Sequence, residues 1–175
     1  MKRIIANIFF AAALVMIQLS FVNGLPFFLS SLNVVLTAAI FVLVLAGLET
    51  ALWWPAAAGV LLDAFSFSPF GLHTASLAIT IILASLLLDN FFTNRSLYSF
   101  LALSAASLLV YELAVNFFGF LAHYFGADRF PLVYNRLFWE VKLWQSLSNL
   151  IFVAVVFYIF NFVSDKLKPV FLARK

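Results

Sequence analysis

The sequence contains no cysteine and only two histidines, His73 and His123. The absence of cysteine excludes disulfides, thiol catalysis and cysteine-based metal sites. The two histidines lie too far apart in the chain for the His-x-x-x-His spacing of zinc enzymes. Nucleotide-binding glycine loops and the Gly-x-Ser-x-Gly pattern are also absent, and the Ser, His and Asp of residues 63–73 fall in one predicted turn. We therefore expect no enzyme activity, no cofactor and no bound metal.

Charged residues are also scarce, and this scarcity sets the class of protein. They make up 10% of the chain, against about 25% in an ordinary soluble domain, while 66% of residues are hydrophobic. The mean hydropathy of +1.12 is too high for a soluble fold of this size. The apolar runs are long and continuous, unlike the alternating pattern of barrel strands. The sequence thus predicts an all-α polytopic membrane protein, with residues 1–175 forming one compact helical bundle.

Polar and helix-breaking residues divide the apolar sequence into six predicted transmembrane helices. A turn at Asn23 to Pro26 separates the first two, and Trp53 and Trp54 mark a membrane interface before the third. The third is short, because Pro55 to Phe67 covers about 20 Å as a helix, against about 30 Å of hydrocarbon. It is therefore either a short span in a thinned bilayer or one arm of a re-entrant hairpin. The six predicted spans are residues 4–22, 27–48, 54–66, 71–88, 97–124 and 141–163.

The distribution of basic residues predicts the orientation. We interpret residues 4–22 as a retained first span and not as a cleaved signal peptide, because the run is longer than a signal core. With six spans both termini lie in the cytoplasm, whereas five spans would place one basic terminus outside. The basic C-terminal tail predicts contact with anionic lipid and not with nucleic acid. The cytoplasmic side then carries seven of the ten basic residues, namely Lys2, Arg3, Arg95, Lys166, Lys168, Arg174 and Lys175.

Polar side chains inside the predicted spans gather in the outer half of the bundle. Glu112 departs most from its surroundings, because an ionisable group at mid-membrane is costly and usually functional. We expect it to be protonated, or paired with Tyr111, Asn116 or His73. Amide side chains such as those of Gln18, Asn33, Gln145 and Asn149 more often join helices than bind ligands. The predicted polar layer comprises His73, Glu112, Asn116, Gln145 and Asn149.

The sharpest interruption of the apolar pattern begins at Gly59, in Gly59-Val-Leu-Leu-Asp63-Ala-Phe-Ser-Phe-Ser-Pro-Phe-Gly71-Leu-His73. It places an aspartate and a histidine on either side of a turn rich in Ser, Pro and Gly. Near the interface, Asp63 is expected to cap this turn through Ser66 or Ser68. His73 alone is more often a satisfied interfacial histidine than a ligand.

This stretch resembles the signature of the rod shape-determining protein MreD family. The family pattern is a Gly, three apolar residues, an Asp, a short Ser/Gly/Pro loop and a Gly that opens the next helix. Over the rest of the chain the resemblance is one of length, hydropathy and a basic C-terminus. The residues that carry the pattern here are Gly59, Asp63, Ser66, Ser68, Pro69 and Gly71.

The resemblance implies a non-enzymatic component of the cell-wall elongation complex in the bacterial inner membrane, with a role in rod shape and peptidoglycan synthesis. Its partners would be the single-span protein MreC and, indirectly, MreB, RodA and a class B penicillin-binding protein. The implied fold is similar to the substrate-binding subunit of energy-coupling-factor transporters, so vitamin capture is the alternative function. Such subunits typically carry an Ala-x-x-x-Ala pair on their first helix. The alanines Ala6, Ala11, Ala12 and Ala13 include no pair four residues apart.

Overall fold

The computed structural model describes residues 2–25, 30, 32–66, 69–91, 97–125 and 136–172. Within these ranges all regular structure is helical and no strand occurs. An all-helical fold, as predicted, is therefore confirmed for this part of the chain. The elements are α1 Lys2–Ser20, the short η1 Val22–Gly24, α2 Val34–Ala46, α3 Leu48–Ala51, the π-helical turn η2 Pro55–Gly59, α4 Val60–Phe65, α5 Leu72–Asn90, α6 Leu97–Tyr124 and α7 Arg136–Leu172.

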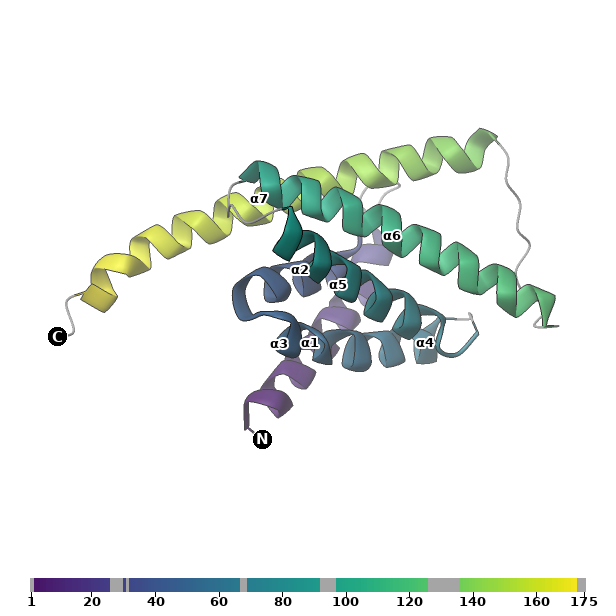
Figure 1. Cartoon of the computed structure of the whole chain (residues 1–175), viewed down its shortest axis with the longest axis horizontal. Helices are drawn as coiled ribbons and strands as arrows, with labels where there is room; N and C mark the ends of the chain where they lie inside the picture. Colours follow the sequence, from purple (N-terminus) through teal and green to yellow (C-terminus); the bar gives the residue numbers. More distant parts are fainter. Residues whose placement is uncertain are drawn as a thin grey trace.

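Helix α5 occupies the middle of the molecule (Figure 1). It packs against α6 on one side and against α2, η2 and α4 on the other, while α1 contacts α2 and η2. Helix α7 crosses α6, and its C-terminal part projects beyond the other helices (Figure 1). The segments from α1 to α6 thus form the packed body, and α7 lies across it.

The core is apolar, with small polar residues where α5 and α6 meet. Leu36, Ile40 and Ile81 are among its largest fully buried side chains. Ser76 and Thr80 are buried on α5, and each hydroxyl donates to the carbonyl four residues earlier, so neither is left unsatisfied. Small residues at such contacts let two helix backbones approach closely, as is common in membrane bundles.

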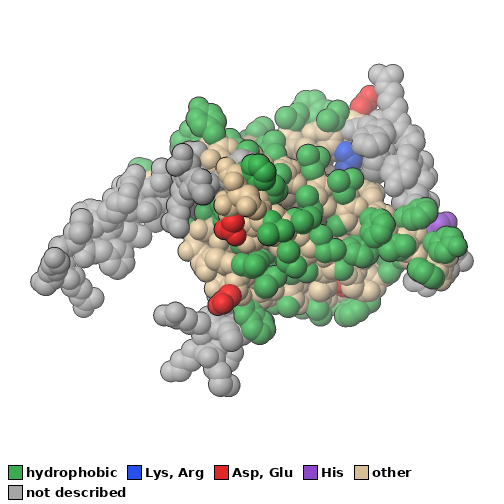
Figure 2. All heavy atoms as spheres, viewed as in Figure 1, with side chains coloured by type: hydrophobic (Ala, Val, Ile, Leu, Met, Phe, Trp, Pro, Cys, Tyr) green, Lys and Arg blue, Asp and Glu red, His purple; other side chains and the backbone are tan. Residues whose placement is uncertain are grey.

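The outer surface is also apolar. Hydrophobic side chains are spread over the face shown in Figure 2, with few charged ones among them. Large side chains such as Phe9, Leu113 and Phe162 are exposed. In water such a surface would drive aggregation, whereas in lipid it is the expected exterior.

Three helices are long and apolar enough to cross a membrane, in the part of the chain whose side chains are described. They are α5, α6 and residues 140–159 of α7. The apolar stretches Ile8–Gly24 and Val34–Ala46 are shorter. The chain is therefore of the membrane-protein type, and the count of six crossings stays a prediction.

Several helix bounds differ from the predicted spans. The second helix begins at Val34 and not at residue 27, because the Asn33 side chain caps it, accepting from the Leu36 N–H at 3.0 Å. Residues 26–29 and 31 lie outside the described part. The third predicted span, residues 54–66, corresponds to the continuous helical residues 53–65, in which the π-helical turn η2 leads directly into α4. Helix α7 begins at Arg136, inside the predicted loop, whereas α6 has the predicted bounds 97–124.

Candidate functional site

The carboxylate of Asp63 lies at the N-terminus of α5, across the turn from its own helix α4. Its Oδ1 accepts from the backbone N–H of His73 at 2.7 Å, and its Oδ2 accepts from those of Gly71 at 3.0 Å and Thr74 at 3.1 Å. The Thr74 hydroxyl donates to Oδ2 at 2.6 Å. Asp63 is only 3% exposed. The first N–H groups of a helix have no intrahelical partner and favour negative charge, so this carboxylate caps α5 and joins it to α4.

These contacts of Asp63 with the start of α5 were not predicted. The sequence predicted a cap of its own turn through Ser66 or Ser68, whereas the four bonds described above go to the following helix. Ser68 lies outside the described residues. Ser66 ends α4 with an extended backbone, and its N–H donates to the Leu62 carbonyl at 2.8 Å. We name the set of Asp63 bonds to residues 71–74 the Asp63 cap.

Gly59 lies where η2 touches α5. A Cβ atom added to Gly59 would meet the Thr74 Cα at 2.5 Å and the Thr74 Oγ1 at 2.9 Å. Real Cβ atoms do not approach other atoms that closely, so only glycine allows the two backbones this contact. The same threonine thus contacts Gly59 through its backbone and Asp63 through its hydroxyl.

Gly71 occupies the position just before α5. Its φ of +95° is in the left-handed region, where a side chain is strained. Its N–H is one of the groups bound by Asp63. The Pro69 carbonyl accepts from the Leu72 N–H at 3.2 Å, which closes the turn. The described residues of the Gly59-to-Gly71 pattern therefore all belong to one junction between α4 and α5.

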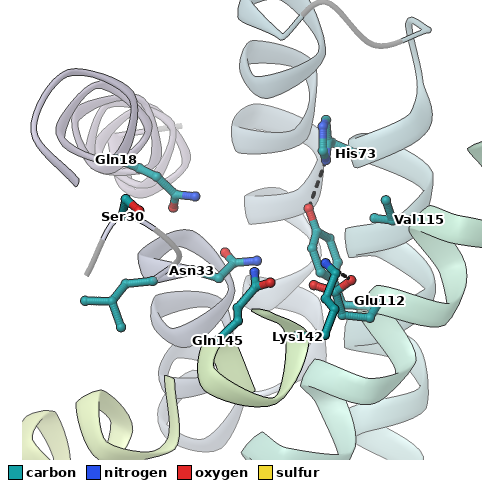
Figure 3. Close-up of a pocket in the computed structure, with 10 residues that line it drawn as sticks. Gln18, Ser30, Asn33, His73, Glu112, Val115, Lys142 and Gln145 are labelled. Carbon is teal, nitrogen blue, oxygen red and sulfur yellow. Dashed lines mark hydrogen bonds and ion pairs between the residues drawn. The ribbon is translucent and has the colours of Figure 1, made fainter. Parts of the chain in front are cut away.

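A pocket of about 240 Å³ lies beside this junction, between five segments of the chain. His73 comes from the start of α5, Glu112 from α6 and Lys142 from α7, and Figure 3 shows Glu112 and Lys142 next to each other with His73 above them. The pocket is lined by Gln18, Ser30, Leu32, Asn33, His73, Tyr111, Glu112, Val115, Lys142 and Gln145.

Glu112 forms an ion pair with Lys142, with 2.5 Å between Oε2 and Nζ. The predicted partners were Tyr111, Asn116 and His73, and Lys142 was not among them. Lys142 precedes Gln145 by about one helical turn, so both side chains lie on the same face of their helix. This spacing is the sequence feature that could have predicted Lys142 as a member of the polar layer. The side chains of Glu112 and Lys142 stay 25% and 31% exposed.

His73 connects the cap to the pocket. Its backbone N–H donates to Asp63, while its Nδ1 lies 2.9 Å from the Tyr111 hydroxyl across the α5–α6 contact. The two rings are stacked, with centroids 6.5 Å apart. The Asp63 cap therefore fixes the backbone of a residue whose side chain forms the pocket wall (Figure 3).

Three amide side chains surround the start of α2. The Gln18 Oε1 accepts from the Val35 N–H at 3.0 Å, and the Asn149 Oδ1 accepts from the Asn33 N–H at 2.7 Å. The Asn33 side chain, just before α2, accepts from the Leu36 N–H. Together with Gln18 of α1 and Asn149 of α7, it satisfies backbone donors at the start of α2. Gln18 and Asn149 thus join α1 and α7 to the start of α2.

The remaining members of the predicted layer divide between the pocket and their own helices. Gln145 lines the pocket, and its backbone carbonyl accepts from the Asn149 Nδ2 at 2.9 Å. Asn116 donates to the Glu112 carbonyl at 2.7 Å and is not part of the pocket wall. His123 is exposed near the end of α6.

The pocket offers one carboxylate, one ammonium, an imidazole, a phenol and amides. Among residues with described side chains, no cluster of three His, Cys, Asp or Glu could hold a metal ion. This chemistry suits the binding of a polar group or the joining of helices. The chain matches no protein family, no curated protein and no solved structure in the comparisons made.

Proposed function

We propose that the protein is a non-enzymatic scaffold of the bacterial cell-wall elongation complex, resembling MreD and binding an MreC-like single-span protein. In this proposal it lies in the inner membrane with six crossings and both termini in the cytoplasm. MreB, RodA and a class B penicillin-binding protein are then indirect partners, reached through the MreC-like protein.

The Gly59-to-Gly71 junction is the observation that carries this proposal. A chance match in an apolar chain would leave the pattern residues without individual roles. Here Gly59 allows the contact with Thr74, Asp63 caps α5, and Gly71 adopts a positive φ. The pattern that resembles the family signature therefore corresponds to one defined structure, which supports the resemblance.

The properties of the pocket also favour a scaffold over a transporter subunit. Sites for drug-sized ligands usually measure about 300 to 1,000 Å³, and this pocket is smaller, at about 240 Å³. Its charged groups are paired with each other, and its amides partly serve as caps of α2. These features suit a reduced cavity whose walls hold helices together.

Capture of a small molecule for an energy-coupling-factor type transporter is the second candidate function. The observation in its favour is the pocket itself, because polar groups from α1, α5, α6 and α7 converge on it. The missing Ala-x-x-x-Ala pair on the first helix argues against it. Measured vitamin uptake that depends on this protein would favour this alternative.

Co-purification with an MreC-like protein tests the scaffold proposal. We expect Asp63→Ala and Gly71→Leu to lower recovery of the partner about fivefold to tenfold, equivalent to about 1 to 1.4 kcal/mol of binding. The reason is that both changes alter the turn before α5 and leave the apolar spans intact. Asp89→Ala is the matched control, because Asp89 is an exposed aspartate at the other end of the same helix.

Recovery is normalised to the amount of folded, detergent-extracted protein, so that loss of partner is separated from loss of fold. Partner recovery at the wild-type level in both junction variants would show that the junction is not the docking surface.

A further inference from the structure

We propose that the pocket binds a compact zwitterion, a molecule with a primary ammonium and an acidic group close together. The inference goes beyond the scaffold function and does not depend on it. It starts from the Glu112–Lys142 pair, whose two opposite charges both remain partly exposed at the pocket wall (Figure 3).

The charge balance of the pocket selects a zwitterion over a simple ion. Glu112 and Lys142 neutralise each other, so a ligand with a net charge would bring an uncompensated charge into a partly desolvated site. A zwitterion placed antiparallel to the pair adds no net charge. Its acidic group lies against Lys142 and its ammonium lies against Glu112. Each charge of the ligand is then next to an opposite charge of the protein.

The neutral groups of the pocket complement this arrangement. Gln145 lies one turn after Lys142 on α7, where its amide can bind either an acidic group or an ammonium. Ser30 and Gln18 line the opposite side (Figure 3). His73 and Tyr111 bond each other and close the remaining wall. Leu32 and Val115 supply the apolar contacts to a short carbon chain.

The volume limits the ligand to a small one. The pocket measures about 240 Å³, which is below the range of about 300 to 1,000 Å³ usual for sites of drug-sized ligands. A pocket of this size favours a molecule such as an amino acid or an aminoethyl phosphate.

The position of the pocket leaves two sources for this chemistry. Gln18 is near the end of α1, Asn33 immediately precedes α2, and His73 is the second residue of α5. The pocket thus lies where α1 ends and α2 and α5 begin, beside Glu112 in the middle of α6. A phosphatidylethanolamine headgroup and a free small zwitterion would both reach it.

Thermal unfolding in nanodiscs of defined lipid separates these sources. We expect phosphatidylethanolamine to raise the apparent melting temperature by about 3 to 6 °C over phosphatidylcholine. Phosphatidylcholine is also a zwitterion, but its ammonium has no N–H to donate to Glu112. Phosphatidylglycerol tests a simple anion, and added glycerophosphoethanolamine or serine tests the soluble form.

The matched variant is Glu112→Gln with Lys142→Met, which removes both charges and keeps the side-chain volumes close. It should abolish the phosphatidylethanolamine shift, whereas Asp89→Asn, outside the pocket, should keep it. Stabilisation by phosphatidylethanolamine alone assigns the lipid as the source, and stabilisation by serine or glycerophosphoethanolamine assigns a free solute. Equal melting temperatures with all additives, or a shift that survives in the double variant, would overturn the proposal.

Discussion

Replacing Asp63 with alanine is expected to lower the free energy of unfolding by about 3 kcal/mol. The carboxylate accepts from three backbone N–H groups and from the Thr74 hydroxyl, and it is only 3% exposed. Removing it leaves these donors without their partner in a place that water reaches poorly, at the positive end of a helix dipole. Reversible unfolding in mixed detergent micelles, followed by circular dichroism, measures the change.

Two variants give this measurement its controls. Asp89→Ala removes an exposed carboxylate from the other end of α5 and should change stability by less than about 0.5 kcal/mol. Asp63→Asn keeps one acceptor, but its amide turns donor hydrogens toward the N–H groups of α5, so it should recover only part of the loss. Equal stability of Asp63→Ala and Asp89→Ala would contradict the cap.

Replacing Gly59 with alanine is the second change with a large expected effect, a loss of about 1 to 3 kcal/mol. The added methyl group would lie 2.5 Å from the Thr74 Cα, so η2 and α5 would have to separate. Because the nearest atom belongs to the backbone of Thr74, no substitution of the Thr74 side chain relieves the contact. The same unfolding assay reports the loss.

Gly119→Ala is the matched control for Gly59→Ala. Gly119 also lies in a helix, but nothing is within 4 Å of a Cβ atom added there. Alanine is a better helix former than glycine, so Gly119→Ala should be neutral or stabilising by up to about 1 kcal/mol. If both substitutions destabilise the protein equally, the close contact of Gly59 with Thr74 is not the cause.

Much of the architecture could be predicted because it depends on composition and periodicity. The scarcity of charge and the continuous apolar runs predict an all-helical membrane protein, and polar residues bounding residues 97–124 predict α6 as it is observed. The predicted depth of the polar residues placed Glu112, Gln145 and His73 in one layer, and all three line the pocket.

The remaining features depend on the rotation and register of one helix against another. The sequence does not reveal that Asp63 faces the start of α5, because its partners are backbone N–H groups, which every helix has. The Glu112–Lys142 pair forms only because α6 and α7 cross where these two residues lie. Thr74 carries no sequence signal, since one threonine in an apolar helix is unremarkable. Helix α2 starts later than predicted because the Asn33 side chain caps it. This capping role was not recognised because Asn33 lies within a long apolar run.

Depletion of the protein in the cells that encode it tests the central claim most directly. Cell width and shape are followed by microscopy while vitamin uptake is measured in the same culture. The scaffold account predicts that rod-shaped cells become round, that uptake is unchanged, and that a wild-type copy restores the rods. Cells that remain rods while uptake of a small molecule falls would contradict it.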